Sequence, residues 1–247
     1  MWIALGFIVT GLVAAMINTV AGGGSLLTLP VLMAMGLSAD VANGSNRLGV
    51  LAQSVMSTLV FAQHDQIRWG AVLRFVGPVV LGAVVGAQIS IELPEAWLRA
   101  SIALVMVGVL CSLWIQPKRW LRERPVGEGW PNSLLWPTLF AVGAYAGFIP
   151  AGAGILFLGA LVLGAGREVV GANALKAGLV AVLTVPALVL FASQGYVAWE
   201  EGLYLAVGQI FGGAIGARIT VSWGPKFVRW VLVFVVLFSL VGMLLFR

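Results

Sequence analysis

The stretch Ala21-Gly-Gly-Gly-Ser25-Leu-Leu-Thr-Leu-Pro30 breaks a long apolar sequence, and Ala151-Gly-Ala-Gly154 breaks it again 130 positions later. An apolar helix is expected before each break, over residues 3–20 and 134–149, and a short apolar piece after it, over residues 25–36 and 155–166. Twelve helical residues rise only about 18 Å, which is too short to cross a bilayer. Each helix and its short piece therefore form either one broken crossing or a re-entrant hairpin.

Composition places the chain in a membrane. Of its 247 residues, 61% are hydrophobic and 9% are charged, whereas soluble domains average about 45–50% apolar and about 25% charged residues. Runs long enough to cross the hydrocarbon core include residues 41–62, 70–90, 96–115 and 226–246. Tryptophans such as Trp69 and Trp199 lie near the ends of such runs, which is typical of the headgroup region, although core aromatics are the alternative. We expect an all-α fold, a polytopic membrane helix bundle surrounded by the lipid bilayer.

The two halves of the chain can be aligned. Val41-Ala-Asn-Gly-Ser-Asn-Arg47 aligns with Val170-Gly-Ala-Asn-Ala-Leu-Lys176, and Gly82-x-x-x-Gly86 aligns with Gly212-x-x-x-Gly216, all at an offset of 129–130 residues. The alignment predicts two transmembrane repeats, residues 1–116 and 133–247, joined by a basic cytoplasmic linker, 117–132. Each repeat comprises a glycine-broken hairpin or split helix and three transmembrane helices. The paired glycines favour close helix contacts over ligand loops.

Loop charge favours the hairpin over the broken crossing. With hairpins, one side of the membrane receives Arg68, Lys118, Arg119, Arg122, Arg124, Arg167, Lys226 and Arg229, and the other side receives Arg99 and Arg247. A broken crossing divides the same residues six against four. The positive-inside rule therefore favours hairpins, which make the second repeat inverted and leave both chain ends outside.

The glycine breaks are candidates for anion binding. Gly22, Gly23, Gly24 and Ser25 in the first break, and Gly152 and Gly154 in the second, lie where a short helix begins. The start of a helix carries free N–H groups and the positive end of the helix dipole. Transporters build substrate sites from such discontinuous helices near the midplane. The alternative is that these glycines only permit tight packing.

Two cations occupy matching positions beyond the breaks. Arg47 and Lys176 each lie seven or eight residues into a helix, which places them about 10 Å deep. Neither has an acidic residue one helical turn away, so the pair suits an anion, unless the long side chains snorkel to the interface. Nearby side chains could donate hydrogen bonds to oxyanion oxygens, or could simply join helices: Asn18, Ser45, Asn46 and Asn173, with Gln53 further along the route.

Other chemistries lack their residues. Cys111 is the only cysteine and His64 the only histidine, so clusters of either as metal ligands are excluded. There is no HExxH motif, P-loop or mid-helix acidic pair. We therefore expect no enzymatic activity, cofactor, metal or nucleic-acid partner. An intramembrane lipid-modifying enzyme and a non-transporting membrane assembly factor remain the alternatives to a permease.

The residues also resemble a known family. Ala21 to Pro30, followed by Gly36-Leu-Ser-Ala-Asp-Val-Ala-Asn-Gly-Ser-Asn46 and the weaker second motif at Ala151–Gly154, is similar to the TauE/SafE sulfite exporter family, also called the 4-toluene sulfonate uptake permease family. The resemblance covers essentially the whole chain. It implies transport of sulfite, a sulfonate or a related organosulfur anion across the bacterial cytoplasmic membrane.

This chain departs from the family pattern in one motif. It carries Asn43-Gly-Ser-Asn46 where many members carry a Gly-Thr pair, and Ala174 stands opposite Ser45. The two half-sites are therefore chemically unequal, and the first is the better candidate. We expect a secondary transporter that uses alternating access. Its partners are the small anion and lipid, with a homodimer and a coupling ion, proton or sodium, left open.

Overall fold

The computed structural model describes residues 2–104 and 129–245, with side chains through residue 224. Its helices are α1 (Trp2–Ala21), α2 (Ser25–Ala34), α3 (Ala39–Gln63), α4 (Trp69–Glu92), α7 (Asn132–Phe148), α8 (Ala153–Gly159), the π-helical η1 (Ala160–Gly164), α9 (Val169–Ser193) and α10 (Trp199–Leu245). Residues 95–104 are also helical. The chain bends at Gly224 within α10, where the backbone leaves the helical region (φ 68°, ψ −167°). Most of the predicted linker, 117–132, and parts of the predicted runs 96–115 and 226–246 lie outside the described residues.

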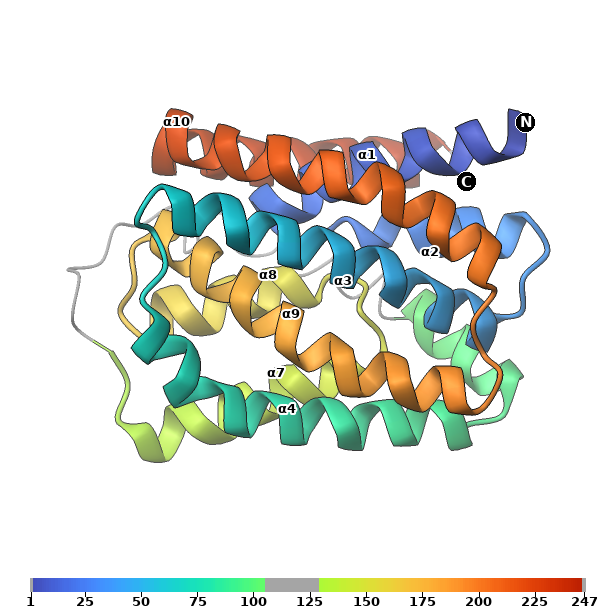
Figure 1. Cartoon of the computed structure of the whole chain (residues 1–247), viewed down its shortest axis with the longest axis horizontal. Coiled ribbons are helices and arrows are strands. Elements are labelled where there is room, and N and C mark those ends of the chain that lie inside the picture. The colour runs from blue at the N-terminus through green and yellow to red at the C-terminus, as the bar shows by residue number, and fades with distance from the viewer. Residues whose placement is uncertain (1, 105–128, 246–247) are drawn as a thin grey trace.

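The described helices form a membrane bundle. Four are long and apolar enough to cross a bilayer: α1, α4, α9 and the Trp199–Gly224 part of α10. The long helices lie roughly along one common direction (Figure 1). Apolar side chains face outward, including Leu73 at 74% exposure, while Asn43 and Asn46 are fully buried. No strand occurs in the ranges that the structure covers. The predicted all-α polytopic membrane fold is confirmed.

The α3 helix is the exception among the long helices. It has 25 residues but is not one of the four spans, because polar residues interrupt its apolar sequence. These polar residues are buried in the core of the bundle. Trp69 and Trp199, the first residues of α4 and α10, are more than half exposed. The alternative that these two are core aromatics is therefore wrong.

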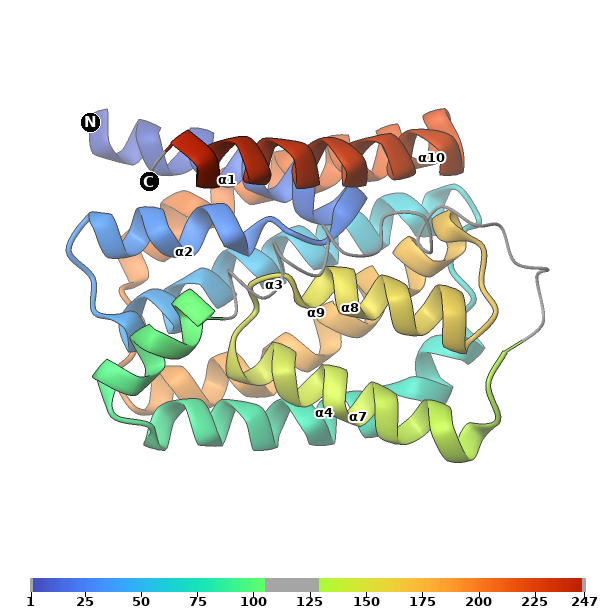
Figure 2. The same ribbon diagram turned by 180° about the vertical axis from the view of Figure 1, so that it is seen from behind.

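The chain turns back at both glycine breaks. α1 stops at Gly22, which adopts the left-handed φ of +88° that glycine tolerates best. α2 then returns toward the end of the bundle where α1 began, and α8 returns in the same way beside α7, starting from the opposite end (Figures 1 and 2). The segments around each break are arranged as hairpins whose tips lie inside the bundle.

Left-handed backbone positions recur with the spacing seen in the sequence. Six of the seven described positions form three pairs, each 130 residues apart: Gly22 and Gly152, Gly36 and Gly166, and Asp65 and Gly195; the seventh, Gly224, has no counterpart. The first pair lies at the breaks, the second after the short helices, and the third after α3 and α9. This recurrence supports the predicted duplication at the level of the backbone.

Glycines bring helices of the two halves into direct contact. A Cβ atom at Gly86 of α4 would lie 1.8 Å from the carbonyl oxygen of Ala144 in α7. A Cβ at Gly212 of α10 would lie 2.2 Å from the carbonyl oxygen of Leu12 in α1. The predicted packing role of both glycine pairs is confirmed. Each contact joins a helix of one predicted repeat to the first helix of the other.

Candidate functional site

The two hairpin tips touch in the middle of the bundle. A Cβ at Gly22 would lie 2.2 Å from the carbonyl carbon of Gly154, and a Cβ at Gly154 would lie 2.4 Å from the Cα of Gly22. Gly24 is equally close to α1, since its Cβ would lie 2.2 Å from the Ala14 carbonyl oxygen. Only glycine fits at these three positions. Gly23 has ordinary surroundings, and Gly152 supplies a left-handed turn (φ 71°) before α8.

A small cavity adjoins the tips. Its volume of about 30 Å³ has room for roughly two water molecules. Helices of both halves line it: Asn18, Thr19, Ser25, Arg47, Val50, Gln53, Ser54, Ser57, Ala146, Pro150, Ala153, Gly154, Lys176, Ala177, Val180, Leu183 and Thr184. Two cations and several hydroxyl and amide groups are included, and no carboxylate belongs to this described lining. The cavity therefore has a mostly apolar wall that carries two cations, and it is small in this conformation.

Arg47 reaches the cavity from α3 and is almost completely buried, at 1% exposure. Its Nη1 donates to the Ala146 carbonyl oxygen (3.4 Å), and its Nη2 donates to the Gly147 carbonyl oxygen and to Asn43 Oδ1 (3.4 Å). The guanidinium carbon lies 4.5 Å from the centre of the Phe191 ring, a cation–π contact. Its Nε is buried and has no hydrogen-bond partner among the described residues. The buried Nε of Arg47 is therefore a donor without a partner in the described structure.

Lys176 reaches the same cavity from α9 and is 4% exposed. Its Nζ donates to the carbonyl oxygens of Asn18 (3.0 Å) and Thr19 (3.1 Å) and to Asn173 Oδ1 (2.7 Å). An ammonium group has three donors, so all of them are engaged. Both cations thus form internal contacts at depth, and the snorkelling alternative is wrong.

The contacts of the two cations are reciprocal. Arg47 of the first half bonds to carbonyls in the last turn of α7, which belongs to the second half. Lys176 of the second half bonds to carbonyls in the last turn of α1, which belongs to the first half. The last carbonyls of a helix lack partners in the helix and carry the negative end of its dipole. Each cation therefore caps a broken helix of the opposite half.

Two predicted site residues hold the hairpins in place beside the cavity. Asn18 donates to Gln53 Oε1 (3.0 Å), and its Oδ1 accepts from the Gly24 N–H (3.3 Å). Asn46 donates to Ser25 Oγ (3.1 Å) and accepts from Thr28 Oγ1 (2.6 Å). Asn46 therefore fastens α2 to α3 but lies outside the cavity lining, whereas Asn18, Ser25 and Gln53 belong to it.

Other predicted residues join helices away from the cavity. Ser45 Oγ donates to the Val41 carbonyl oxygen (2.6 Å) and accepts from the Ala198 N–H (2.8 Å), just before α10 begins. Asn173 holds Lys176 and also donates to the Val20 carbonyl oxygen (3.2 Å). Neither residue lines the cavity. For these two side chains, the geometry is that of polar contacts between segments of the bundle.

The sequence reading missed part of the lining. Thr19, Ser54, Ser57 and Thr184 all line the cavity but were not candidates. Helical periodicity could have found three of them, because residues 7 and 10 positions after Arg47, and 8 positions after Lys176, lie on the same helix face. Thr19 could not be found in this way, because it lies on α1 and reaches the cavity through the packing of α1 against α3. Its Oγ1 lies 3.1 Å from Ser57 Oγ.

The histidine that an intramembrane enzyme could use lies away from the cavity. His64 follows the end of α3, and its Nδ1 lies 2.9 Å from the Val60 carbonyl oxygen, outside the cavity. Cys111 falls outside the described residues. No group of three or more histidine, cysteine, aspartate or glutamate side chains that could hold a metal occurs in the described ranges.

Known proteins resemble this chain along most of its length. The sequence model of the family described as "Sulfite exporter TauE/SafE" matches residues 7–243. The "Probable membrane transporter protein YfcA" of Escherichia coli K12 is 29% identical over 225 residues, which cover 91% of this chain and 83% of that protein. The "Probable membrane transporter protein ORF9" of a Sinorhizobium species is 26% identical over 233 residues, covering 92% and 87%. No solved structure matches.

Proposed function

We propose that this chain, which belongs to the sulfite exporter TauE/SafE family and is a membrane transporter, is a permease for a small oxyanion. The proposed substrate is sulfite, a sulfonate or a related organosulfur oxyanion. The sign of its charge follows from the cavity, and the choice of sulfur follows from the family. The bacterial relatives support a place in the cytoplasmic membrane.

One observation carries the proposal: Arg47 and Lys176 are buried around one cavity whose described lining holds no carboxylate. Ionised side chains inside a membrane are costly and commonly mark a substrate pathway. The helix-end carbonyls compensate these two cations only partly, because a carbonyl carries a partial charge. An anion in the cavity supplies the missing negative charge.

The neutral groups around the cavity suit an oxyanion in particular. The starts of α2 and α8 reach it at Ser25 and Gly154, and helix starts favour negative charge. Asn18, Gln53 and Ser54 add amide and hydroxyl groups. Sulfite and sulfonate groups present several acceptor oxygens, and charge-assisted hydrogen bonds to such oxygens are stronger than neutral ones.

Alternating access is the proposed mechanism, with residues 1–116 and 133–247 as inverted copies joined by the linker 117–132. The opposed hairpins and the left-handed positions spaced 130 residues apart support this division. Each cation grips the other copy's broken helix. An entering anion competes with those carbonyls for the same donors, which loosens the hold between the copies and lets the small cavity enlarge.

The test is uptake of radiolabelled sulfite into proteoliposomes by Arg47→Gln, Lys176→Gln and the double variant. Each single change is expected to reduce uptake about tenfold or more, because a hydrogen bond to a charged group contributes about 1.5–3 kcal/mol. Arg218→Gln is the matched control, since Arg218 is exposed on α10 outside the cavity. Uptake by the double variant at the level of the control would overturn the site.

The same vesicles test coupling and substrate choice. Imposed proton or sodium gradients are expected to change the wild-type rate if either ion is coupled, and methanesulfonate or chloride in excess competes only if it enters the site. Sulfite uptake no faster than in protein-free vesicles, with each gradient applied, would contradict the proposed substrate.

A further inference from the structure

A second and larger cavity opens at one end of the bundle. Its volume is about 270 Å³, and it lies between the loop joining α3 to α4 and the loop joining η1 to α9. Its polar lining includes Asp65, Gln66, Arg68, Arg167 and Glu168. The proposed transport site does not include any of these residues. We refer to this space as the outer cavity.

The two arginines of the outer cavity lack partners in the described part of the chain. Neither Arg68 nor Arg167 forms a side-chain hydrogen bond or ion pair with a described residue. The one salt bridge among the described residues joins Arg99 to Glu95. The pKa of Arg167 is lowered, mainly by burial and to a smaller extent by repulsion from Arg68 and Arg74. Arg68 and Arg74 are thus both close enough to repel the guanidinium group of Arg167. An anion between Arg68 and Arg167 would relieve that repulsion.

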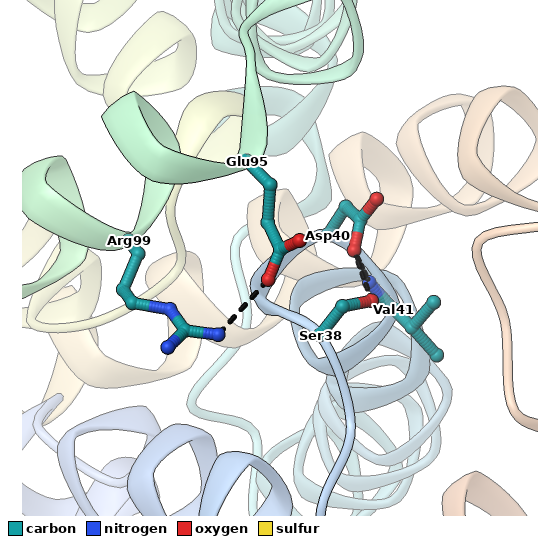
Figure 3. Close-up of polar contacts among 5 residues, drawn as sticks. All are labelled: Ser38, Asp40, Val41, Glu95 and Arg99. Atoms are coloured by element: carbon teal, nitrogen blue, oxygen red, sulfur yellow. Dashed lines mark hydrogen bonds and ion pairs between the residues drawn. The ribbon is translucent and has the colours of Figure 1, made fainter.

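The opposite end of the bundle has the reverse charge. Its described carboxylates are Asp40, Glu92, Glu95, Glu200 and Glu201, which outnumber its one arginine, Arg99. Figure 3 shows how two of them are occupied: Glu95 pairs with Arg99 (2.9 Å), and Asp40 accepts from the Ser38 hydroxyl and from the Val41 N–H (2.8 Å). At the end with the outer cavity, Arg68, Arg74, Arg167 and Arg218 outnumber Asp65 and Glu168. The described charges therefore favour anions at the end that holds the outer cavity over the far end, while the cavity lining itself balances Arg68 and Arg167 against Asp65 and Glu168.

The outer cavity and the central cavity are lined by neighbouring residues of α9. Leu175 of α9 lines the outer cavity, and the next two residues, Lys176 and Ala177, line the central cavity. Leu175 is buried in the apolar core, and it lines the outer cavity but not the central one. A single turn of α9 therefore separates the arginines at the bundle end from the buried cations.

We propose that the outer cavity is a second oxyanion site, in which Arg68 and Arg167 bind the anion before it moves past Leu175 to the central cavity. This inference rests on the proposed transport function for the direction of traffic, but the binding chemistry stands on the cavity itself. Guanidinium groups bind phosphate-like and sulfonate-like oxygens in a forked geometry. The same chemistry would recognise the phosphate of a lipid headgroup, so the experiment separates a free anion from a lipid.

Binding can be tested without transport, by chemical protection of arginines in the purified full-length protein. Phenylglyoxal modifies accessible guanidinium groups, and mass spectrometry reports the extent at each residue. We expect inorganic sulfate to slow the modification of Arg68 and Arg167 at least about threefold relative to Arg218, since both groups would be engaged by one dianion. Equal rates at all three residues, with and without sulfate, would overturn the site even if transport is normal.

The kinetic test uses Arg68→Gln, Arg167→Gln and their double variant, with Arg218→Gln as the control for charge at the same end. In phosphatidylcholine vesicles, the double variant is expected to raise the KM for sulfite about tenfold, the loss of about one charge-assisted contact, while kcat stays within about twofold. Added salt should raise the wild-type KM and leave that of the double variant nearly unchanged.

The lipid arm repeats the measurement in vesicles that contain phosphatidylglycerol. If a headgroup fills the outer cavity, the anionic lipid changes wild-type kinetics and the double variant loses that response, which supports the site with lipid as its ligand. A double variant whose kinetics match those of Arg218→Gln in both kinds of vesicle contradicts this second oxyanion site. Failure of Arg47→Gln and Lys176→Gln to reduce transport would instead refute the proposed function.

Discussion

At the scale of single residues, the two buried cations are matched in position but unequal in what they leave free. Lys176 spends all three donors on protein acceptors, whereas Arg47 keeps its Nε without a partner in the described structure. A buried donor without a partner carries a desolvation penalty of about 1–3 kcal/mol, more for charged groups. Arg47 is therefore the cation better prepared to bind an anion, and Lys176 the one better fitted to hold a helix end.

This difference predicts the result of Arg47→Lys. Lysine keeps the charge and can reach carbonyl oxygens, but it loses the Nε donor and the flat contact with Phe191. We expect the KM for the transported anion to rise about tenfold, equivalent to one charge-assisted hydrogen bond. Arg218→Lys provides the same exchange at an exposed position. An unchanged KM in Arg47→Lys would mean that charge alone is recognised.

At the scale of elements, the glycine breaks end one helix, start another and allow two backbones to meet. The GxxxG pairs of α4 and α10 allow the same close approach without a break: added Cβ atoms at Gly82, Gly86 and Gly212 would collide with carbonyl oxygens of α7 and α1, and one at Gly216 would lie 3.0 Å from Thr19 Cβ. Neighbouring glycines differ: Gly77, on the same helix as Gly86, has no heavy atom of the described structure within 4 Å of an added Cβ. Close packing is therefore confined to particular faces.

The hairpin tip can be tested with Gly22→Ala. The new methyl group would meet Gly154 at 2.2 Å in addition to the left-handed φ of 88°. Gly36→Ala is the matched control, because Gly36 has a φ of 96° but nothing described within 4 Å of an added Cβ. Gly36→Ala should cost about 1–3 kcal/mol of backbone strain, and Gly22→Ala clearly more. Thermal unfolding followed by size-exclusion chromatography measures both; equal losses would show that the contact between tips is unimportant.

The sequence predicted most of the elements but fewer of their contacts. Breaks at Gly22 and Gly152 announce helix ends locally, because glycine and apolar run length are properties of the neighbouring chain. The depth of Arg47 could also be counted along its helix. Its acceptors could not, since Ala146 and Gly147 come from a distant helix. The partner of Ser45 could not be counted either, because the Ala198 N–H that it accepts depends on where α10 begins.

At the scale of the whole molecule, the halves are interleaved and do not sit side by side as separate bodies. α4 packs against α7, and α10 packs against α1, in each case through glycines. The buried cations cross between the halves in the same manner. The bundle ends also differ in charge, with arginines in excess around the outer cavity and carboxylates in excess at the far end. The stability of the bundle and the proposed anion pathway therefore both depend on the two halves together.

Interleaving predicts that the chain can be cut but the halves cannot stand alone. Residues 1–116 and 133–247, expressed separately, should each be degraded or aggregate, because each exposes packing faces and leaves its buried cation without the carbonyl acceptors of the other half. Co-expressed, the two fragments should copurify and restore transport. A tag on one fragment and uptake by the pair provide the measurement. A single fragment that is monodisperse by itself would contradict this arrangement.

The reciprocal contacts also impose an order on biosynthesis. Lys176 finds its acceptors 157 and 158 residues behind it, already made and inserted. Arg47 must wait for carbonyls 99 and 100 residues ahead, a delay of about 5–20 seconds at ordinary ribosome speeds. During that interval the nascent first half lies in the bilayer with an ionised side chain whose one described acceptor in that half is Asn43 Oδ1. Translation speed between α3 and α7 thus becomes part of how reliably the protein is made, and the interval is when membrane quality control can discard it.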